Sequence, residues 1–114
     1  MIAHSLRDEF FGPAQQMHGA TYVVDAIFYS EDLNPQNTVI DIGLAHQLLK
    51  DVLSDLNYKN LDEHQDMVGD LTTTEYLAKY IHDKLKSSAN GHFGGTLEII
   101  LGESHVAWAS YKGS

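Results

Sequence analysis

The alternation of apolar and polar residues predicts four strands and two helices along the chain. Residues 1–6 and 20–29 form the first pair of predicted strands, and the second of these alternates throughout with β-branched and aromatic side chains. Residues 97–101 and 106–111 alternate in the same way, and the short link between them predicts an antiparallel hairpin. Residues 38–40 are also expected to be extended.

Between the two strand pairs, apolar residues recur at three- and four-residue intervals, which is typical of amphipathic helices. Asp41 is expected to be the N-cap of the first helix, because its carboxylate can accept from the first backbone amides. Thr72 and Glu75 have the spacing of a capping box and predict the start of the second helix.

The order strand–strand–helix–helix–strand–strand predicts an α+β fold (ββααββ), with a four-stranded antiparallel sheet and two helices on one face. The chain, residues 1–114, has room for one domain. Such a sheet has two unpaired edges, and a closed ring of copies would remove both. We therefore expect an oligomer.

The charge balance argues against two classes of partner. Seven Lys and Arg residues against sixteen Asp and Glu give a net charge of −9, which repels nucleic acids and anionic membrane surfaces. No apolar run approaches the length of a membrane span. The chain has no cysteine, which excludes disulfides, thiolate metal sites and a cysteine nucleophile and fits a cytoplasmic protein.

Seven histidines are the one unusual feature of the composition. His46 and His82, in the predicted helices, are expected to face solvent, and His64 and His92 fall in polar loops. The remaining three histidines and one carboxylate flank strand ends, where side chains can converge: His4, His18, His105 and Glu103. Converging imidazoles would suit Zn²⁺, and the carboxylate would suit a cation or a paired N–H edge. The alternative is a set of unconnected polar residues.

Several segments resemble the family of 6-pyruvoyl-tetrahydropterin synthase and 6-carboxy-tetrahydropterin synthase, in the same order along nearly the whole chain. Residues 2–6 resemble the Ala-Ala-His-Arg-Leu strand of that family, and residues 17–22 its His-Gly-His-Asn-Tyr motif. Residues 39–42 resemble the hydrophobic-Asp-Phe motif, and residues 56–61 resemble Leu-Asp-His-Lys-x-Leu. Residues 72–78 resemble Pro-Thr-x-Glu-x-Leu-Ala, and residues 102–113 resemble the terminal Glu-Thr…Tyr-x-Gly.

The resemblance implies the tunnelling fold (T-fold), in which neighbouring copies complete a barrel, and a homo-hexamer of two stacked trimers. It also implies a small-molecule ligand with a pterin- or purine-like ring, anchored by Glu103. Family members hold zinc with three histidines. His4 and His18 match two of them, Ala20 stands at the third, and His105 is a possible replacement.

The catalytic positions of the family are changed in this chain. Ala14 stands where the family has its cysteine, and Asn57 and Tyr58 stand where it has the Asp-His pair. An amide does not titrate and a tyrosine is a poor base at neutral pH, so we expect the standard carbon–oxygen lyase reaction to be absent and zinc binding to be weak. The first strand also looks shorter than in the family, as in a late start or one half of a tandem protein.

Three interpretations remain open from the sequence. The chain binds a pterin- or purine-like ring without the lyase reaction; it is an active lyase of altered chemistry in pterin or deazapurine metabolism, with a rebuilt metal site; or it is a structural or regulatory subunit without a ligand. Bound metal would favour the second interpretation. A ring ligand without metal would favour the first, and an empty pocket the third.

Overall fold

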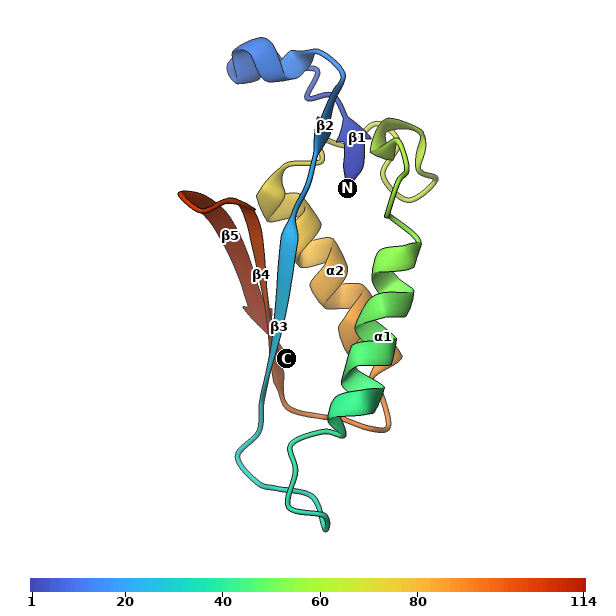
Figure 1. Ribbon diagram of the computed structural model, residues 1–114, viewed down its shortest axis with the longest axis vertical. Helices are drawn as coiled ribbons and strands as arrows, with labels where there is room; N and C mark the ends of the chain where they lie inside the picture. The colour runs from blue at the N-terminus through green and yellow to red at the C-terminus, as the bar shows by residue number, and fades with distance from the viewer.

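A computed structural model describes residues 1–114 as an elongated molecule of about 51 × 27 × 20 Å, in which two helices pack against an antiparallel sheet (Figure 1). In chain order the elements are β1 (Ile2–His4), the 3-10 helix η1 (Glu9–Gln15), β2 (His18–Ala20), β3 (Val23–Tyr29), α1 (Ile42–Ser54), the 3-10 helix η2 (Leu61–Glu63), α2 (Thr74–Ser88), β4 (Thr96–Ser104) and β5 (Ala107–Gly113). The predicted α+β class is confirmed.

The strands form two sheets where the sequence predicted one sheet of four strands. β1 pairs with β2, from Ile2 opposite Ala20 to His4 opposite His18, and β3, β4 and β5 form a separate antiparallel sheet in that order. The predicted strand 20–29 is therefore divided, because the β1 ladder ends at Ala20 and β3 pairs only with β4. Figure 1 shows β2 leading into β3, with β1 beside β2. β1 also contacts the segment around η2, where Ala3 forms an isolated bridge with Asn60.

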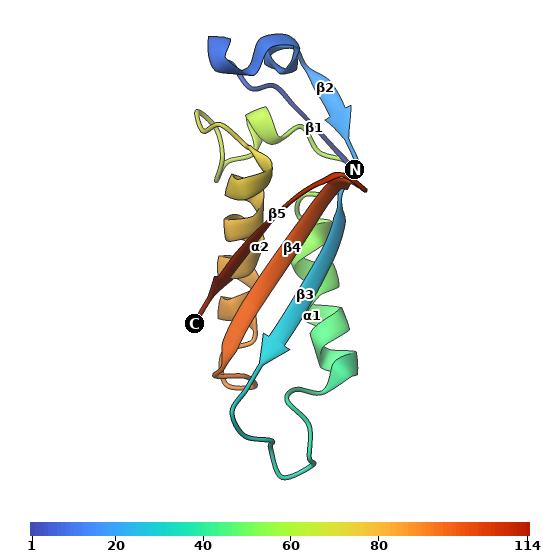
Figure 2. The same cartoon turned by 90° about the vertical axis from the view of Figure 1, so that its left-hand side faces the viewer.

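The core lies between the sheet and the helices, which cover the same face of the sheet (Figure 2). Every second residue of β4 points inward, which explains the alternation read from the sequence. α2 packs directly on β4 and β5, and α1 packs beside α2. Buried side chains at this interface include Leu77, Ala78, Ile81, Leu85, Leu97, Ile99 and Leu101. Neither helix has the length and continuous hydrophobicity that a transmembrane span requires.

The first predicted helix cap is confirmed and the second is displaced by one residue. Asp41 accepts a hydrogen bond from the Leu44 amide at 2.9 Å and caps α1. The cap of α2 is Thr73, whose hydroxyl accepts from the Tyr76 amide at 3.1 Å. Thr72, the expected cap, is fully buried and its hydroxyl is hydrogen-bonded to the His4 ring.

Residues 38–40 do not form the predicted extended segment, because the Asn34 side chain organises this loop. Its Oδ1 accepts from the backbone amides of Gln36 and Thr38 and from the Thr38 hydroxyl, at 3.0–3.1 Å. These local bonds satisfy the backbone without a partner strand, so the chain turns here before α1 begins.

His82 was predicted to face solvent, and this was wrong: it is only 3% exposed. Its Nδ1 contacts Asp83 Oδ1 at 2.9 Å, and its Nε2 contacts the Gly113 carbonyl at 3.1 Å, which ties α2 to the end of β5. The ring also meets Tyr111 edge-on, with 4.6 Å between centroids. His64 lies in a loop as predicted, where its Nε2 contacts Asp55 Oδ2 at 2.9 Å, and His46 and His92 are exposed.

Replacing His82 with alanine should destabilise the fold by about 1–3 kcal/mol, since the change removes a buried ring and leaves the Gly113 carbonyl without its partner. Urea unfolding followed by circular dichroism measures this free energy. His46→Ala, on an exposed face of α1, is the matched control and should change stability by no more than about 0.5 kcal/mol. Equal unfolding midpoints for the two variants would contradict the role of His82.

Candidate functional site

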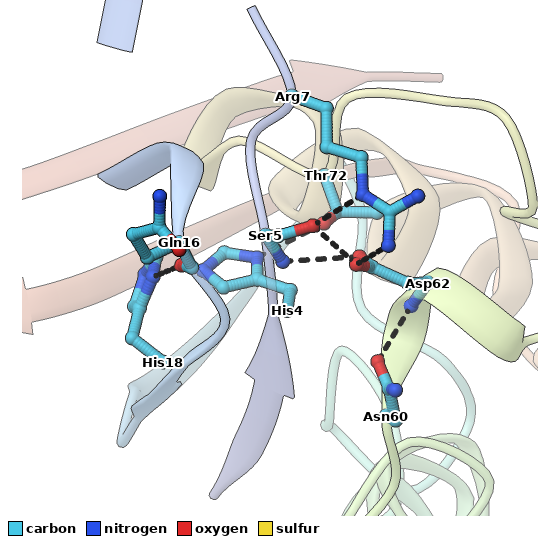
Figure 3. A network of polar contacts seen from close by, with 8 residues as sticks. All are labelled: His4, Ser5, Arg7, Gln16, His18, Asn60, Asp62 and Thr72. Atoms are coloured by element: carbon cyan, nitrogen blue, oxygen red, sulfur yellow. Dashed lines mark hydrogen bonds and ion pairs between the residues drawn. The ribbon is translucent and has the colours of Figure 1, made fainter. Parts of the chain in front are cut away.

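His4 and His18 face each other across the short β1–β2 ladder. They are directly paired in register, and their rings meet edge-on with 4.6 Å between centroids (Figure 3). His4 is 2% exposed, whereas His18 is half-buried. The structure thus brings together two of the four residues that the sequence placed at strand ends.

Each imidazole of this pair is held through its Nδ1 atom. His18 Nδ1 donates to the Gln16 carbonyl at 2.8 Å, which leaves its Nε2 as the nitrogen with a free lone pair. His4 Nδ1 is hydrogen-bonded to the Thr72 hydroxyl at 2.9 Å. Its Nε2 is the ring nitrogen that this hydrogen bond does not engage. Such outer contacts orient imidazoles that bind metals or exchange protons.

Burial lowers the pKa of His4, and the neighbouring His18 lowers this pKa further because two imidazolium charges would repel each other. The Thr72 contact and the more distant Asp62 and Glu103 carboxylates oppose this shift but do not outweigh it. His4 is therefore neutral at pH 7, the form in which imidazole binds metals or accepts a proton.

Polar contacts that the sequence did not indicate hold β1 beside this pair. Asp62 in η2 accepts from the Ser5 amide at 3.1 Å and from the Ser5 hydroxyl, and its own amide donates to Asn60 Oδ1 at 3.0 Å (Figure 3). Arg7 approaches Asp62 at 3.9 Å. Burial raises the pKa of Asp62, but the Ser5 hydrogen bonds and Arg7 outweigh burial and lower it overall.

The residues around the pair fit two metal ligands but not three. No group of three His, Cys, Asp or Glu side chains comes together anywhere in the structure. Ala20 lies two residues beyond His18 on β2, which is the same face of the strand, about 7 Å along it. His105 lies in the turn between β4 and β5 and is exposed. The residues present therefore do not complete a three-ligand zinc site.

Glu103 follows the buried row of β4, at the point where the strand register shifts between Gly102 and Ser104. Its side chain is exposed, and its one hydrogen bond is a long contact of 3.4 Å from the Thr74 hydroxyl at the start of α2. The carboxylate therefore retains most of its capacity to accept hydrogen bonds.

Two open hollows have Glu103 in their walls. One, of about 420 Å³, lies between the start of α2 and β5, and its walls include Thr74, Glu103 and Trp108. The other, of about 400 Å³, also has Glu103 and Trp108 in its walls and adds His105 and Asp25. Glu103 and His105, the two remaining strand-end residues, thus both line the second hollow. Trp108 is paired in register with Gly102, so its side chain lies on the face of the sheet opposite to the buried row of β4.

Tyr22 lies between β2 and β3 along the chain, near Thr74 and Glu103. Burial raises the pKa of its hydroxyl; Thr74 lowers it in part, and the Glu103 and Glu75 charges add to the rise. The hydroxyl therefore remains protonated at neutral pH, when it can donate a hydrogen bond but cannot act as a base.

The positions matched to the catalytic residues of the family have other contacts in this structure. Ala14 lies in η1 and its carbonyl accepts from the Leu6 amide at 3.0 Å. Asn57 Oδ1 accepts from the amino group of Met1 at 2.9 Å. Tyr58 is 82% exposed and has a positive φ of 63°. None of the three is hydrogen-bonded to the histidine pair or to Glu103.

Comparisons with known proteins agree with this architecture. The family model for 6-pyruvoyl tetrahydropterin synthase matches residues 1–114. Among solved structures, 6-pyruvoyl tetrahydropterin synthase of Caenorhabditis elegans superposes with a TM-score of 0.84 and 26% sequence identity, over 99% of this chain and 89% of that one. A search of curated proteins finds no match. The chain belongs to the 6-pyruvoyl tetrahydropterin synthase family and has its T-fold.

Proposed function

We propose that this protein binds a pterin- or purine-like ring through Glu103 and does not carry out the standard lyase reaction of its family. Such rings present parallel N–H donors along one edge. A carboxylate accepts two of these donors at once, which fixes the ring's orientation as well as its affinity.

The observation that carries the proposal is the state of the Glu103 carboxylate. It is exposed at the wall of two hollows, it has a single long hydrogen bond, and no Lys or Arg side chain forms an ion pair with it. Thr74 beside it can turn its hydroxyl toward the carboxylate or toward a ligand. Family membership supports the choice of a pterin-like ring over other ligands with two adjacent donors.

The proposed loss of the lyase reaction follows from the residue types at the matched positions. Ala14 offers no nucleophile, Asn57 cannot titrate, and Tyr58 projects into solvent. General acid–base catalysis is typically worth about 10²–10⁴ in rate, so these changes would remove most of that contribution.

The histidine pair is the feature that would support a second candidate, an active lyase of altered chemistry with a rebuilt metal site, which would need a third ligand that this chain does not bring to the pair. Zinc, when bound in such sites, polarises substrate oxygens and lowers the pKa of bound water. In this chain His4 and His18 would hold it through their Nε2 atoms, since Nδ1 of each is engaged. Conversion of dihydroneopterin triphosphate by the zinc-supplemented protein would favour this candidate; unchanged substrate favours binding alone.

Glutamine at position 103 should weaken ring binding at least about tenfold, because one acceptor oxygen becomes a donor facing a ligand N–H. Titration calorimetry with neopterin and with guanosine measures the affinity of the wild type and of Glu103→Gln. Glu98→Gln, on the same strand but hydrogen-bonded to Tyr29, is the matched control and should bind as the wild type does. Equal affinity for Glu103→Gln, or no binding by the wild type, would reject the proposal.

Zinc content should be low in the wild type and should rise in Ala20→His, because the new imidazole lies on the same face of β2 as His18 and adds a third donor. Metal analysis after dialysis against a weak chelator measures both. His18→Ala in the Ala20→His background should return zinc to the wild-type content. One zinc per wild-type chain would contradict weak binding and favour the rebuilt site.

We further propose that the protein is a cytoplasmic homo-hexamer. The outer edges of β3 and β5 are unpaired in the three-stranded sheet, and pairing between copies would satisfy both. Sedimentation equilibrium at micromolar concentration should show a single species of about six chains. A stable monomer under these conditions would contradict the proposal.

A further inference from the structure

We propose that the Tyr22 hydroxyl is a second polar contact for the ring anchored by Glu103, and that it donates to a carbonyl oxygen beside the ring's pair of N–H groups. This inference rests on the proposed function of Glu103. It narrows the ligand from any flat ring with two adjacent donors to a ring that also carries a carbonyl next to them.

Tyr22 and Glu103 approach the start of α2 from the same side of the sheet. Val23 pairs with Gly102, and continuing this register by one residue places Tyr22 opposite Glu103. The Tyr22 ring packs against the core between the sheet and the helices. Glu103 turns toward the same side, because it accepts from the Thr74 hydroxyl at 3.4 Å. The two side chains are therefore neighbours on the face of the sheet that the helices cover.

The proton of the Tyr22 hydroxyl is not taken by a carboxylate of this chain, in contrast to three other tyrosines. The hydroxyls of Tyr29, Tyr76 and Tyr80 each donate to a carboxylate, at 2.8–2.9 Å. Thr74 approaches Tyr22, but the Thr74 hydroxyl donates to Glu103.

The Tyr22 oxygen is also accessible. No enclosed side-chain oxygen or nitrogen of the structure lacks a hydrogen-bond partner, so the Tyr22 oxygen, which has none of ordinary length, is open to solvent. Burial of the residue raises the pKa of this hydroxyl, so it keeps its proton at neutral pH. Tyr22 thus offers an O–H donor that a ligand can reach.

A donor beside a carboxylate defines the edge that fits both. Glu103 accepts two N–H groups, and Tyr22 donates one hydrogen bond next to them. The complementary edge has two N–H groups followed by a carbonyl oxygen, as in the 2-amino-4-oxo pyrimidine edge shared by pterin and guanine. A site that hydrogen-bonds such a group discriminates against analogues that lack it, because its own polar group is then left unpaired.

The test compares guanosine with 6-thioguanosine, which keeps both N–H donors but replaces the carbonyl oxygen with sulfur, a weak acceptor. Titration calorimetry should show that the wild type binds guanosine about fivefold more tightly, as expected for one hydrogen bond between neutral groups. Tyr22→Phe keeps the ring and removes only the hydroxyl. This variant should bind guanosine about fivefold more weakly than the wild type and should bind 6-thioguanosine with unchanged affinity.

Tyr80→Phe is the matched control. It removes a tyrosine hydroxyl that donates to Asp66 at 2.9 Å, and Tyr80 lies outside both hollows that Glu103 lines. This variant should bind both nucleosides as the wild type does. Circular dichroism of the two variants checks that each is folded.

The outcomes separate this inference from the proposed function. Weakened guanosine binding in Glu103→Gln, with a preference for guanosine that persists in Tyr22→Phe, would overturn the Tyr22 contact and leave the anchor intact. Equal affinity of the wild type for the two nucleosides would also overturn this contact. No binding of either nucleoside by the wild type, or unchanged binding by Glu103→Gln, would reject the anchor itself and this inference with it.

Discussion

Three consecutive threonines at the start of α2 connect the fold to both groups of candidate site residues. Thr73 caps the helix, Thr72 is hydrogen-bonded to His4 at 2.9 Å, and Thr74 donates to Glu103 at 3.4 Å. Because α2 packs directly on β4 and β5, this turn is fixed relative to the sheet. The histidine pair and the carboxylate are therefore positioned by one short segment whose own backbone is stabilised by the helix cap.

This arrangement explains why the capping pattern misled the sequence analysis. Thr72 and Glu75 have the spacing of a capping box, and Thr73 has no corresponding partner in the sequence, so local rules favour Thr72. The deciding contact is with His4, 68 residues away, which no local pattern contains. The tertiary hydrogen bond takes the Thr72 hydroxyl, and the cap moves to the next hydroxyl along the chain.

The elements with strong periodicity were predictable, and the long-range pairings were not. The alternation of β4 and the apolar stripe of α2 follow directly from burial against each other. The division between β2 and β3 depends on how far β1 pairs, and the burial of His82 depends on the Gly113 carbonyl at the far end of the chain. The candidate site residues were found in the sequence from their places at strand ends and from the family resemblance, whereas the role of Thr72 emerged only from the structure.

The His4–His18 pair and Glu103 differ in how far each can function without further residues. The histidine pair has two imidazoles already oriented by Gln16 and Thr72, but only two, so metal chemistry there depends on a third ligand. Glu103 needs no further residue to accept a pair of N–H groups, and its acidic surroundings favour ligands that donate hydrogen bonds. If other residues of a site are replaced, a residue that can bind a ligand without them can keep its function. The edge recognition proposed for Glu103 would meet that condition, and metal-assisted proton transfer at the histidines would not.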